Sequence, residues 1–193
     1  AGEWEGDLDK YYSGRRANGI YVPRYRNIGS DKRDYLRGFG YQGGGSRQGW
    51  QRNVAELSFG ADFKEELTKP GNWTMGFGGF GETLPYFENR VYLHKTDKDK
   101  WGLPLPVFDA ELKENEKKMR VDMQNDAIEM LEKSGVKNVK GYDRGSYLGM
   151  AIHEMGTARM GRDPKTSVLN GNNQVWGAKN VFVTYGSFMV SAS

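Results

Sequence analysis

Two stretches of the sequence, Gly38-Phe-Gly-Tyr-Gln-Gly43 and Gly76-Phe-Gly-Gly-Phe-Gly81, interleave glycine with aromatic residues. The chain as a whole has 27 glycines among 193 residues, about twice the usual share of roughly 7%. Glycine weakens a strand, and it is found in strands where a bulge, a bend or a ligand brings another group close to the backbone. The longer extended regions, residues 35–42 and 73–83, therefore predict a glycine-rich β-sheet.

Both stretches also match the dinucleotide-binding pattern G-x-G-x-x-G. In that pattern the glycines form a tight turn that begins a helix, and the pyrophosphate binds at the helix N-terminus. Here Gly43 is followed by further glycines without an amphipathic period, and Pro85 comes four residues after Gly81. We therefore interpret both matches as strands rather than nucleotide-binding loops.

One long amphipathic helix is predicted over about residues 110–134. Asp109 is a candidate N-cap, and Gly135 is placed for the left-handed residue that follows a helix. Apolar residues recur there at steps of three and four, which is the period of a helix face. They are Leu112, Met119, Met123, Ala127, Met130 and Leu131. We interpret this row as core, with a groove for a partner as the alternative.

Shorter elements complete the prediction. Residues 19–22, 89–94 and 180–184 are expected to be strands because they are rich in β-branched and aromatic side chains. Residues 56–67 are expected to hold a further strand and a turn of helix. The predicted fold class is α+β, mainly an antiparallel sheet covered by helices on one face.

Composition excludes several classes of protein. Aromatic residues make up 13% of the chain, too many for a disordered tail, and no apolar run reaches the roughly 20 residues of a membrane-spanning helix. The net charge is only +3, from scattered basic residues, so a mixed-charge surface is favoured over nucleic-acid binding. Without cysteine there is no disulfide or thiolate, and His94 and His153 as the two histidines predict no intrinsic metal site.

The segment His153-Glu-Met-Gly-Thr-Ala-Arg-Met-Gly161 stands out chemically. It is not the zinc-protease motif H-E-x-x-H, because Thr157 stands where the second histidine would be. Histidine is the side chain suited to act as a general base near neutral pH. Gly156 and Thr157 are small enough for a flat cofactor to approach the backbone. A structural histidine remains the alternative.

This segment resembles the C-terminal signature of the glucose–methanol–choline (GMC) oxidoreductases. The similarity continues through blocks that follow in the same order, and it also covers upstream pieces. These are residues 163–169, 173–177 and 180–187 downstream, and residues 89–93 and 98–104 upstream.

The resemblance implies a flavin enzyme that oxidises an alcohol, often a sugar hydroxyl, with FAD as hydride acceptor. His153 then corresponds to the base that takes the hydroxyl proton. Gly156, Thr157, Tyr185 and Gly186 correspond to residues beside the flavin. The family also implies a six-stranded antiparallel sheet roofed by helices. We accordingly expect residues 1–150 to be a substrate-binding domain and residues 151–193 to belong to the flavin domain.

Three departures from the family pattern affect these expectations. No G-x-G-x-x-G in a strand–turn–helix context is present, and the partner histidine or asparagine of the family is expected beyond Ser193. Tyr185 stands where the family usually has aspartate, so the flavin contacts of that aspartate are in doubt here. We therefore expect the chain, which starts at Ala1 without methionine, to be a fragment that alone is inactive and binds no flavin.

For the substrate, a small alcohol or sugar, we expect Phe39, Tyr41 and Phe77 to present their rings from the glycine-rich sheet. A non-catalytic carbohydrate-binding module is the competing function, and an interaction domain that uses the methionine-rich helix explains less. The sequence does not give the electron acceptor, the compartment or the oligomeric state.

Overall fold

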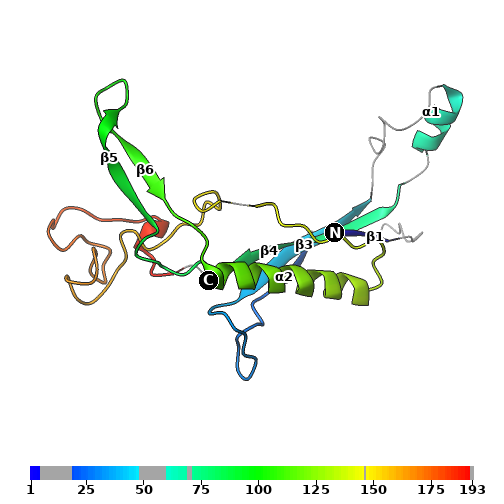
Figure 1. The fold of residues 1–193 in the computed structure, drawn as a ribbon, viewed down its shortest axis with the longest axis horizontal. Coiled ribbons are helices and arrows are strands. Elements are labelled where there is room, and N and C mark those ends of the chain that lie inside the picture. The colour runs from blue at the N-terminus through cyan, green and yellow to red at the C-terminus, as the bar shows by residue number, and fades with distance from the viewer. Residues whose placement is uncertain (5–18, 48–59, 69–70, 146, 192–193) are drawn as a thin grey trace. The chain divides into compact units, whose positions relative to one another are not determined.

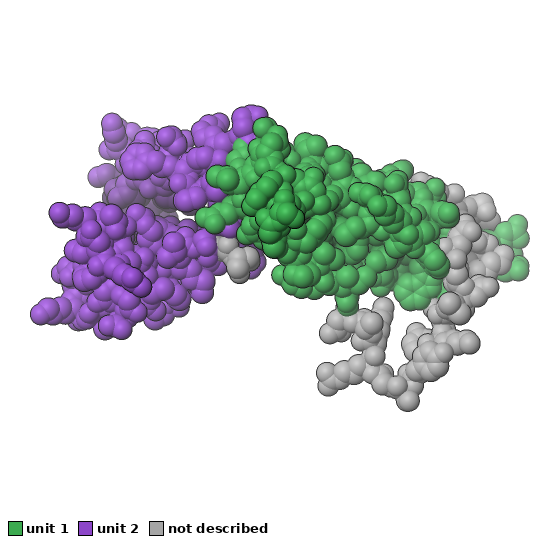
Figure 2. Space-filling view, turned by 90° about the horizontal axis from the view of Figure 1, so that it is seen from below, with its two compact units in different colours: residues 1–81, 115–144 green, residues 82–114, 145–193 purple. Residues whose placement is uncertain are grey.

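The structure is a computed structural model that describes residues 1–4, 19–47, 60–68, 71–145 and 147–191. The chain forms two compact units, coloured separately in Figure 2. Unit 1 comprises residues 1–81 and 115–144, and unit 2 comprises residues 82–114 and 145–193. These units do not coincide with the predicted domains 1–150 and 151–193, whose boundary remains a prediction.

Unit 1 contains a four-stranded antiparallel sheet in the order β1-β4-β3-β2 (Figure 1). The strands are β1 (Gly2–Trp4), β2 (Ile20–Val22), β3 (Phe39–Arg47) and β4 (Trp73–Gly81). β3 and β4 pair along their full length, from Phe39 opposite Gly81 to Arg47 opposite Trp73. The two glycine-rich stretches are thus each other's partners, which confirms them as strands and not nucleotide-binding loops.

Glycine in this pair of strands is required by close packing. A Cβ at Gly43 would overlap the carbonyl oxygen of Gly76 and lie 2.7 Å from the ring of Phe77. A Cβ at Gly79 would overlap the sulfur of Met123, and one at Gly81 would lie 2.6 Å from the sulfur of Met119. The glycines therefore make room for side chains that lie across them.

This packing predicts a difference between two glycines of β3. In Gly43→Ala the new methyl group meets backbone that cannot turn aside, so we expect a loss of about 1–3 kcal/mol in unfolding free energy. Gly45→Ala is the matched control, because its nearest neighbour would be the Thr74 carbonyl oxygen at 3.5 Å, an ordinary contact. Urea unfolding of both variants measures the difference, and equal stability would contradict the packing.

The long helix α2 (Glu114–Lys133) covers one face of this sheet (Figure 1). Met119 of the helix is buried against Phe39 and Tyr41 of β3, which confirms the apolar row as core. The C-terminal prediction is also confirmed. Gly135 has φ +87°, and the N–H of Val136 donates to the Leu131 carbonyl oxygen at 3.1 Å, as in the usual left-handed helix ending.

The start of the helix differs from the prediction. Asp109 is the last residue of a strand, β6 (Pro104–Asp109), and so does not cap the helix. β6 pairs with β5 (Arg90–Lys98) in a two-stranded hairpin within unit 2. This confirms the predicted strand over 89–94 and extends it, whereas β6 itself was not predicted.

Two further predictions meet different outcomes. Helix α1 (Ala61–Thr68) confirms the helical part of the expectation for residues 56–67, while residues 56–59 lie outside the described part. The predicted strand over 180–184 is wrong, because only Phe182 forms an isolated bridge, to Gln174. The described residues form sheets of four and two strands rather than the six-stranded sheet expected from the family. The α+β fold class is confirmed, and no helix among the described residues is long and apolar enough to cross a membrane.

A buried polar cluster fastens the β2–β3 connection to α2. The carboxylate of Asp126, on the helix, accepts hydrogen bonds from the Tyr25 hydroxyl at 2.7 Å and from Arg26 Nε and Nη2 at 2.7 and 2.6 Å. Burial and then the Asp126 hydrogen bond raise the pKa of Tyr25 to about 12. One turn away, the Tyr35 hydroxyl donates to Asp122. The connection is therefore held by charge-assisted bonds as well as by apolar packing.

Candidate active site

His153 lies on an exposed turn of unit 2 whose backbone is tightly folded. Gly149 and Gly156 have φ +89° and +87°, values that favour glycine. Ile152, immediately before the histidine, has φ +57°, which is rare for a β-branched residue. Its side chain is 86% exposed, so no packing in the described residues offsets the strain. Such strain is concentrated at functional sites.

Two segments that the sequence separates by some thirty residues are joined beside this turn. The N–H of Ala158 donates to the Ser187 carbonyl oxygen at 3.0 Å, and the N–H of Met160 donates to the Phe188 carbonyl oxygen at 2.9 Å. Phe188 ends a short 3₁₀ helix, η1 (Gly186–Phe188). The predicted flavin-facing residues Gly156 and Thr157 are thereby brought next to Tyr185 and Gly186.

The two glycines of this junction lie against backbone. A Cβ at Gly156 would lie 3.7 Å from the Val190 carbonyl oxygen, and one at Gly186 would lie 3.5 Å from the Glu154 carbonyl oxygen. Both distances are ordinary contacts, so space alone does not demand glycine at either position. The backbone does at Gly156, through its positive φ.

A small hydrogen-bonded frame supports the junction. Leu169 is fully buried, and its carbonyl oxygen accepts from the Gly161 N–H at 2.9 Å. Trp176 donates its indole N–H to Ser167 Oγ at 3.0 Å and its backbone N–H to the Val168 carbonyl oxygen at 3.2 Å. This frame of side-chain and backbone bonds takes the place of regular secondary structure in residues 161–184.

The junction has an exposed edge and a buried polar atom. His153, Thr157 and Tyr185 are exposed. Ser187 is buried, and its hydroxyl has no hydrogen-bond partner among the described residues. Sequence reasoning did not single out Ser187, because a serine carries no signal of its burial. The edge presents one imidazole, one hydroxyl and one phenol.

The predicted substrate residues lie elsewhere, in unit 1. Phe39 and Tyr41 are each 1% exposed, and their rings pack edge to face at 5.6 Å between centroids. The Tyr41 hydroxyl donates to the Met123 carbonyl oxygen at 2.7 Å. Phe77 is partly buried against the same core. The expectation that Phe39 and Tyr41 present ring faces to a sugar needs correction, because α2 and neighbouring side chains cover those faces.

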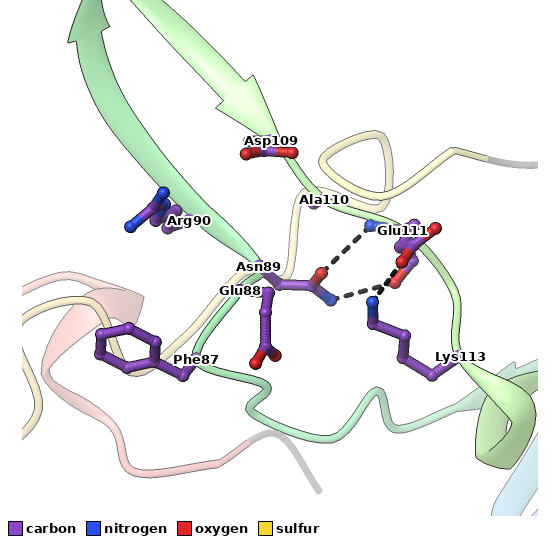
Figure 3. A pocket seen from close by; sticks show the side chains of 8 residues that line it. All are labelled: Phe87, Glu88, Asn89, Arg90, Asp109, Ala110, Glu111 and Lys113. Atoms are coloured by element: carbon purple, nitrogen blue, oxygen red, sulfur yellow. Dashed lines mark hydrogen bonds and ion pairs between the residues drawn. The ribbon is translucent and has the colours of Figure 1, made fainter.

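A separate cavity of about 530 Å³ lies at the base of the β5–β6 hairpin in unit 2 (Figure 3). Asn89 spans it as an extension of the ladder. Its side-chain amide donates to the Glu111 carbonyl oxygen and accepts from the Glu111 N–H, both at 3.1 Å (Figure 3). Lys113 forms an ion pair with Glu111. None of the predicted site residues lines this cavity, and its polar groups hold the hairpin together.

The family model for GMC oxidoreductases matches residues 85–193, more than half of the chain. This chain belongs to the GMC oxidoreductases. The matched region contains the whole hairpin, the His153 turn and the junction with η1.

GMC relatives of this chain are enzymes with different substrates in their names. It is 35% identical over 124 residues to 2-methyl-1,2-propanediol dehydrogenase of Mycolicibacterium austroafricanum, covering 63% of this chain and 22% of the relative. Paromamine 6'-oxidase of Streptomyces fradiae is 33% identical over 54% of this chain and 19% of its own length. The gluconate 2-dehydrogenase flavoprotein of Pantoea cypripedii is 26% identical over 65% and 22%, respectively. The match therefore spans about a fifth of the length of these relatives.

Proposed function

We propose that this GMC chain contributes the catalytic histidine and a substrate-binding sheet to an FAD-dependent enzyme that oxidises a CH–OH group of a small alcohol or sugar. The observation that carries the proposal is the junction of unit 2. The histidine segment and the η1 segment, which match the family model, are hydrogen-bonded side by side there.

The residues of the junction fit a flat, polar cofactor. Gly156 and Gly186 add no side chain to the edge formed by His153, Thr157 and Tyr185. The unpartnered Ser187 hydroxyl is a polar group available beneath that edge after a small local movement. Aspartate at position 185 would place a negative charge at this edge. Tyr185 offers a neutral hydroxyl there instead, so the cofactor contact at this position differs in kind from that of the usual family pattern.

His153 is assigned the proton step. Its imidazole nitrogen accepts the proton of the substrate hydroxyl, which makes the carbon-bound hydrogen a better hydride donor. When bound, FAD supplies the acceptor for that hydride. The exposed position of His153 lets a substrate reach it without an opening of unit 2. The electron acceptor that reoxidises the enzyme is outside this proposal.

The test of the proposed function uses the flavin-loaded enzyme that contains this chain. We expect anaerobic addition of an oxidisable alcohol or sugar to bleach the flavin absorbance, with one carbonyl product formed per flavin reduced. A panel of diols, polyols and pyranoses identifies the substrate class. A stably oxidised flavin with every member of the panel would overturn the proposal.

The 193-residue chain by itself is expected to be colourless. A bound flavin would give an absorbance band at about 450 nm, and a cofactor of this kind is held mainly by a dinucleotide-binding loop, whereas both G-x-G-x-x-G matches here are paired strands. The absorbance spectrum of the purified chain checks this. A stoichiometric yellow chromophore would contradict it, and sugar binding without flavin would favour a carbohydrate-binding module.

A further inference from the structure

The face of the unit 1 sheet that α2 leaves uncovered carries a different set of side chains from the one predicted. Residues directly opposite in antiparallel strands point to the same face, and neighbours along a strand point to opposite faces. Tyr41 and Gly79 are opposite one another on the helix-covered face. Gln42 and Phe80 must therefore point away from α2, and so must Tyr21, which is opposite Gln42.

Exposure agrees with this assignment. Tyr21 is 67% and Phe80 is 56% exposed, in contrast to the buried Phe39 and Tyr41. Gln42 is exposed as well, and no protein group among the described residues hydrogen-bonds to its amide. The uncovered face thus has two rings and one amide that the fold itself does not use.

The space between the two rings is floored by glycine. Gln42 is opposite Gly78, and Phe80 is opposite Gly40. At Gly78 the nearest atoms to an added Cβ would be the Gln42 carbonyl oxygen at 3.7 Å and the Phe80 ring at 4.0 Å, so the floor there is open. Strand spacing and rise place the Cα atoms of Tyr21 and Phe80 about 12 Å apart. That span accommodates a pyranose ring against one aromatic ring with the other at its edge.

The charge of this face identifies the chemistry of its ligand. Tyr21, Gln42, Ser46, Thr74 and Phe80 are neutral, and the ionisable residue of the face, Glu3, lies at its β1 end and accepts from the Asn138 side chain at 3.3 Å. An uncharged surface of rings, amide and hydroxyls complements a neutral polyol, whose CH groups pack on rings and whose hydroxyls bond to amides. It offers no partner for a phosphate or a carboxylate.

We infer that this face, with Phe80 and Tyr21 as stacking rings and Gln42 as hydrogen-bonding group, binds the pyranose ring of a neutral sugar substrate. The inference rests on the proposed function and names its substrate class. It also explains why the chain has glycine at positions 40 and 78, where a side chain would occupy the place of the sugar.

The test compares two substrates in the flavin-loaded enzyme, D-glucose and the acyclic 1,2-propanediol. For Phe80→Ala we expect the half-saturating glucose concentration for flavin reduction to rise roughly five- to tenfold, with the limiting rate changed less than about twofold. Gln42→Leu is expected to raise it several-fold, and Phe80→Tyr is expected to restore wild-type affinity. The diol, which has no ring to stack, should be unaffected by all three substitutions.

Tyr142→Ala is the matched control, since Tyr142 is an exposed aromatic residue of unit 1, 59% exposed, outside the strands. Unchanged glucose affinity in Phe80→Ala and Gln42→Leu, in an enzyme that glucose still reduces, would overturn the sugar face while leaving the proposed function intact. A change of oligomeric state in Phe80→Ala with unchanged sugar affinity would also overturn it, because the face would then be a protein contact.

Failure of the proposed function gives a distinguishable result, because then neither glucose nor the diol reduces the flavin of the wild type. Saturation-transfer NMR with methyl α-D-glucopyranoside still tests the face in that case. Transfer to the ring protons of the sugar in the wild type, lost in Phe80→Ala and kept in Tyr142→Ala, would support the inference. Equal transfer in all three proteins would overturn it.

Discussion

Replacing His153 by asparagine in the flavin-loaded enzyme is expected to slow flavin reduction by roughly 10²–10⁴-fold, the usual contribution of a general base. Asparagine keeps a polar side chain of similar reach but cannot accept the hydroxyl proton. Because the side chain of His153 is exposed and the neighbouring Ile152 is held by its own backbone conformation, the turn should keep its shape. Stopped-flow measurement of the limiting reduction rate, at saturating substrate, gives the size of the effect.

Two controls separate catalysis from structure. Glu154→Gln alters the next exposed residue and is expected to leave the reduction rate within about threefold, since surface substitutions change little. Added imidazole should partly restore the rate of His153→Ala, because a free base in the vacated space can take the proton. A His153→Asn enzyme with full flavin content that is reduced at the wild-type rate would remove His153 from the mechanism.

The second large effect is on stability. Asp126→Ala is expected to lower the free energy of unfolding by about 2–4 kcal/mol, since a buried charge without its partner costs about 3–5 kcal/mol and the Arg26 side chain keeps 22% exposure that softens the loss. The substitution leaves the Tyr25 hydroxyl and the Arg26 guanidinium without their common acceptor. Urea unfolding monitored by tyrosine fluorescence measures the change.

Asp34→Ala is the control for this prediction. Asp34 also pairs with a residue of α2, Lys118, at 2.8 Å, but both side chains are largely exposed. Exposed pairs contribute little, so this variant should unfold close to the wild type. An equal loss in both variants would mean that the cluster around Asp126 has no special share in holding the β2–β3 connection.

The same cluster makes stability depend on pH in a defined direction. Burial alone would raise the pKa of the Asp126 carboxyl, but hydrogen bonds from Arg26 and Tyr25 lower it below its ordinary value. Its stabilising contribution is therefore complete above the unfolded pKa of about 3.9 and is lost as the pH falls through the folded pKa. Asp126→Asn should show a flatter loss of stability on acidification than the wild type. Tyr25 acts at the other end, and its contribution is present below about pH 10 and lost as the pH rises toward 12.

Sequence reasoning identified the strands and the helix of unit 1 but not which face of the sheet the helix covers. Normally the covered face is the more apolar one. In β4 the pattern is inverted, because Gly79 and Gly81 lie under methionines of α2 while the bulkier Phe80 points outward. Periodicity therefore gave the right strands and the wrong face for substrate contact at Phe39 and Tyr41.

The other misses have equally local causes. Residues 180–184 have strand-like composition, but a strand needs a neighbour, and only Phe182 has one. Two prolines hid β6 from a composition-based assignment, and β6 in turn takes Asp109 away from the helix. The candidate active site was predictable from its motifs as a set of residues. Its joining of Ala158 to Ser187 and of Met160 to Phe188 depends on long-range backbone bonds that no local pattern reveals.

The overlap of Gly79 and Met123 also ties the sequences of helix and sheet to each other. A larger residue at position 79 is acceptable only if position 123 becomes smaller, so the two sites should show strong energetic coupling in a double-mutant cycle. Gly81 and Met119 repeat the relation one helical turn away. Variants of this fold are therefore expected to change in matched pairs across the interface, and a library that diversifies α2 alone will consist mostly of unstable proteins.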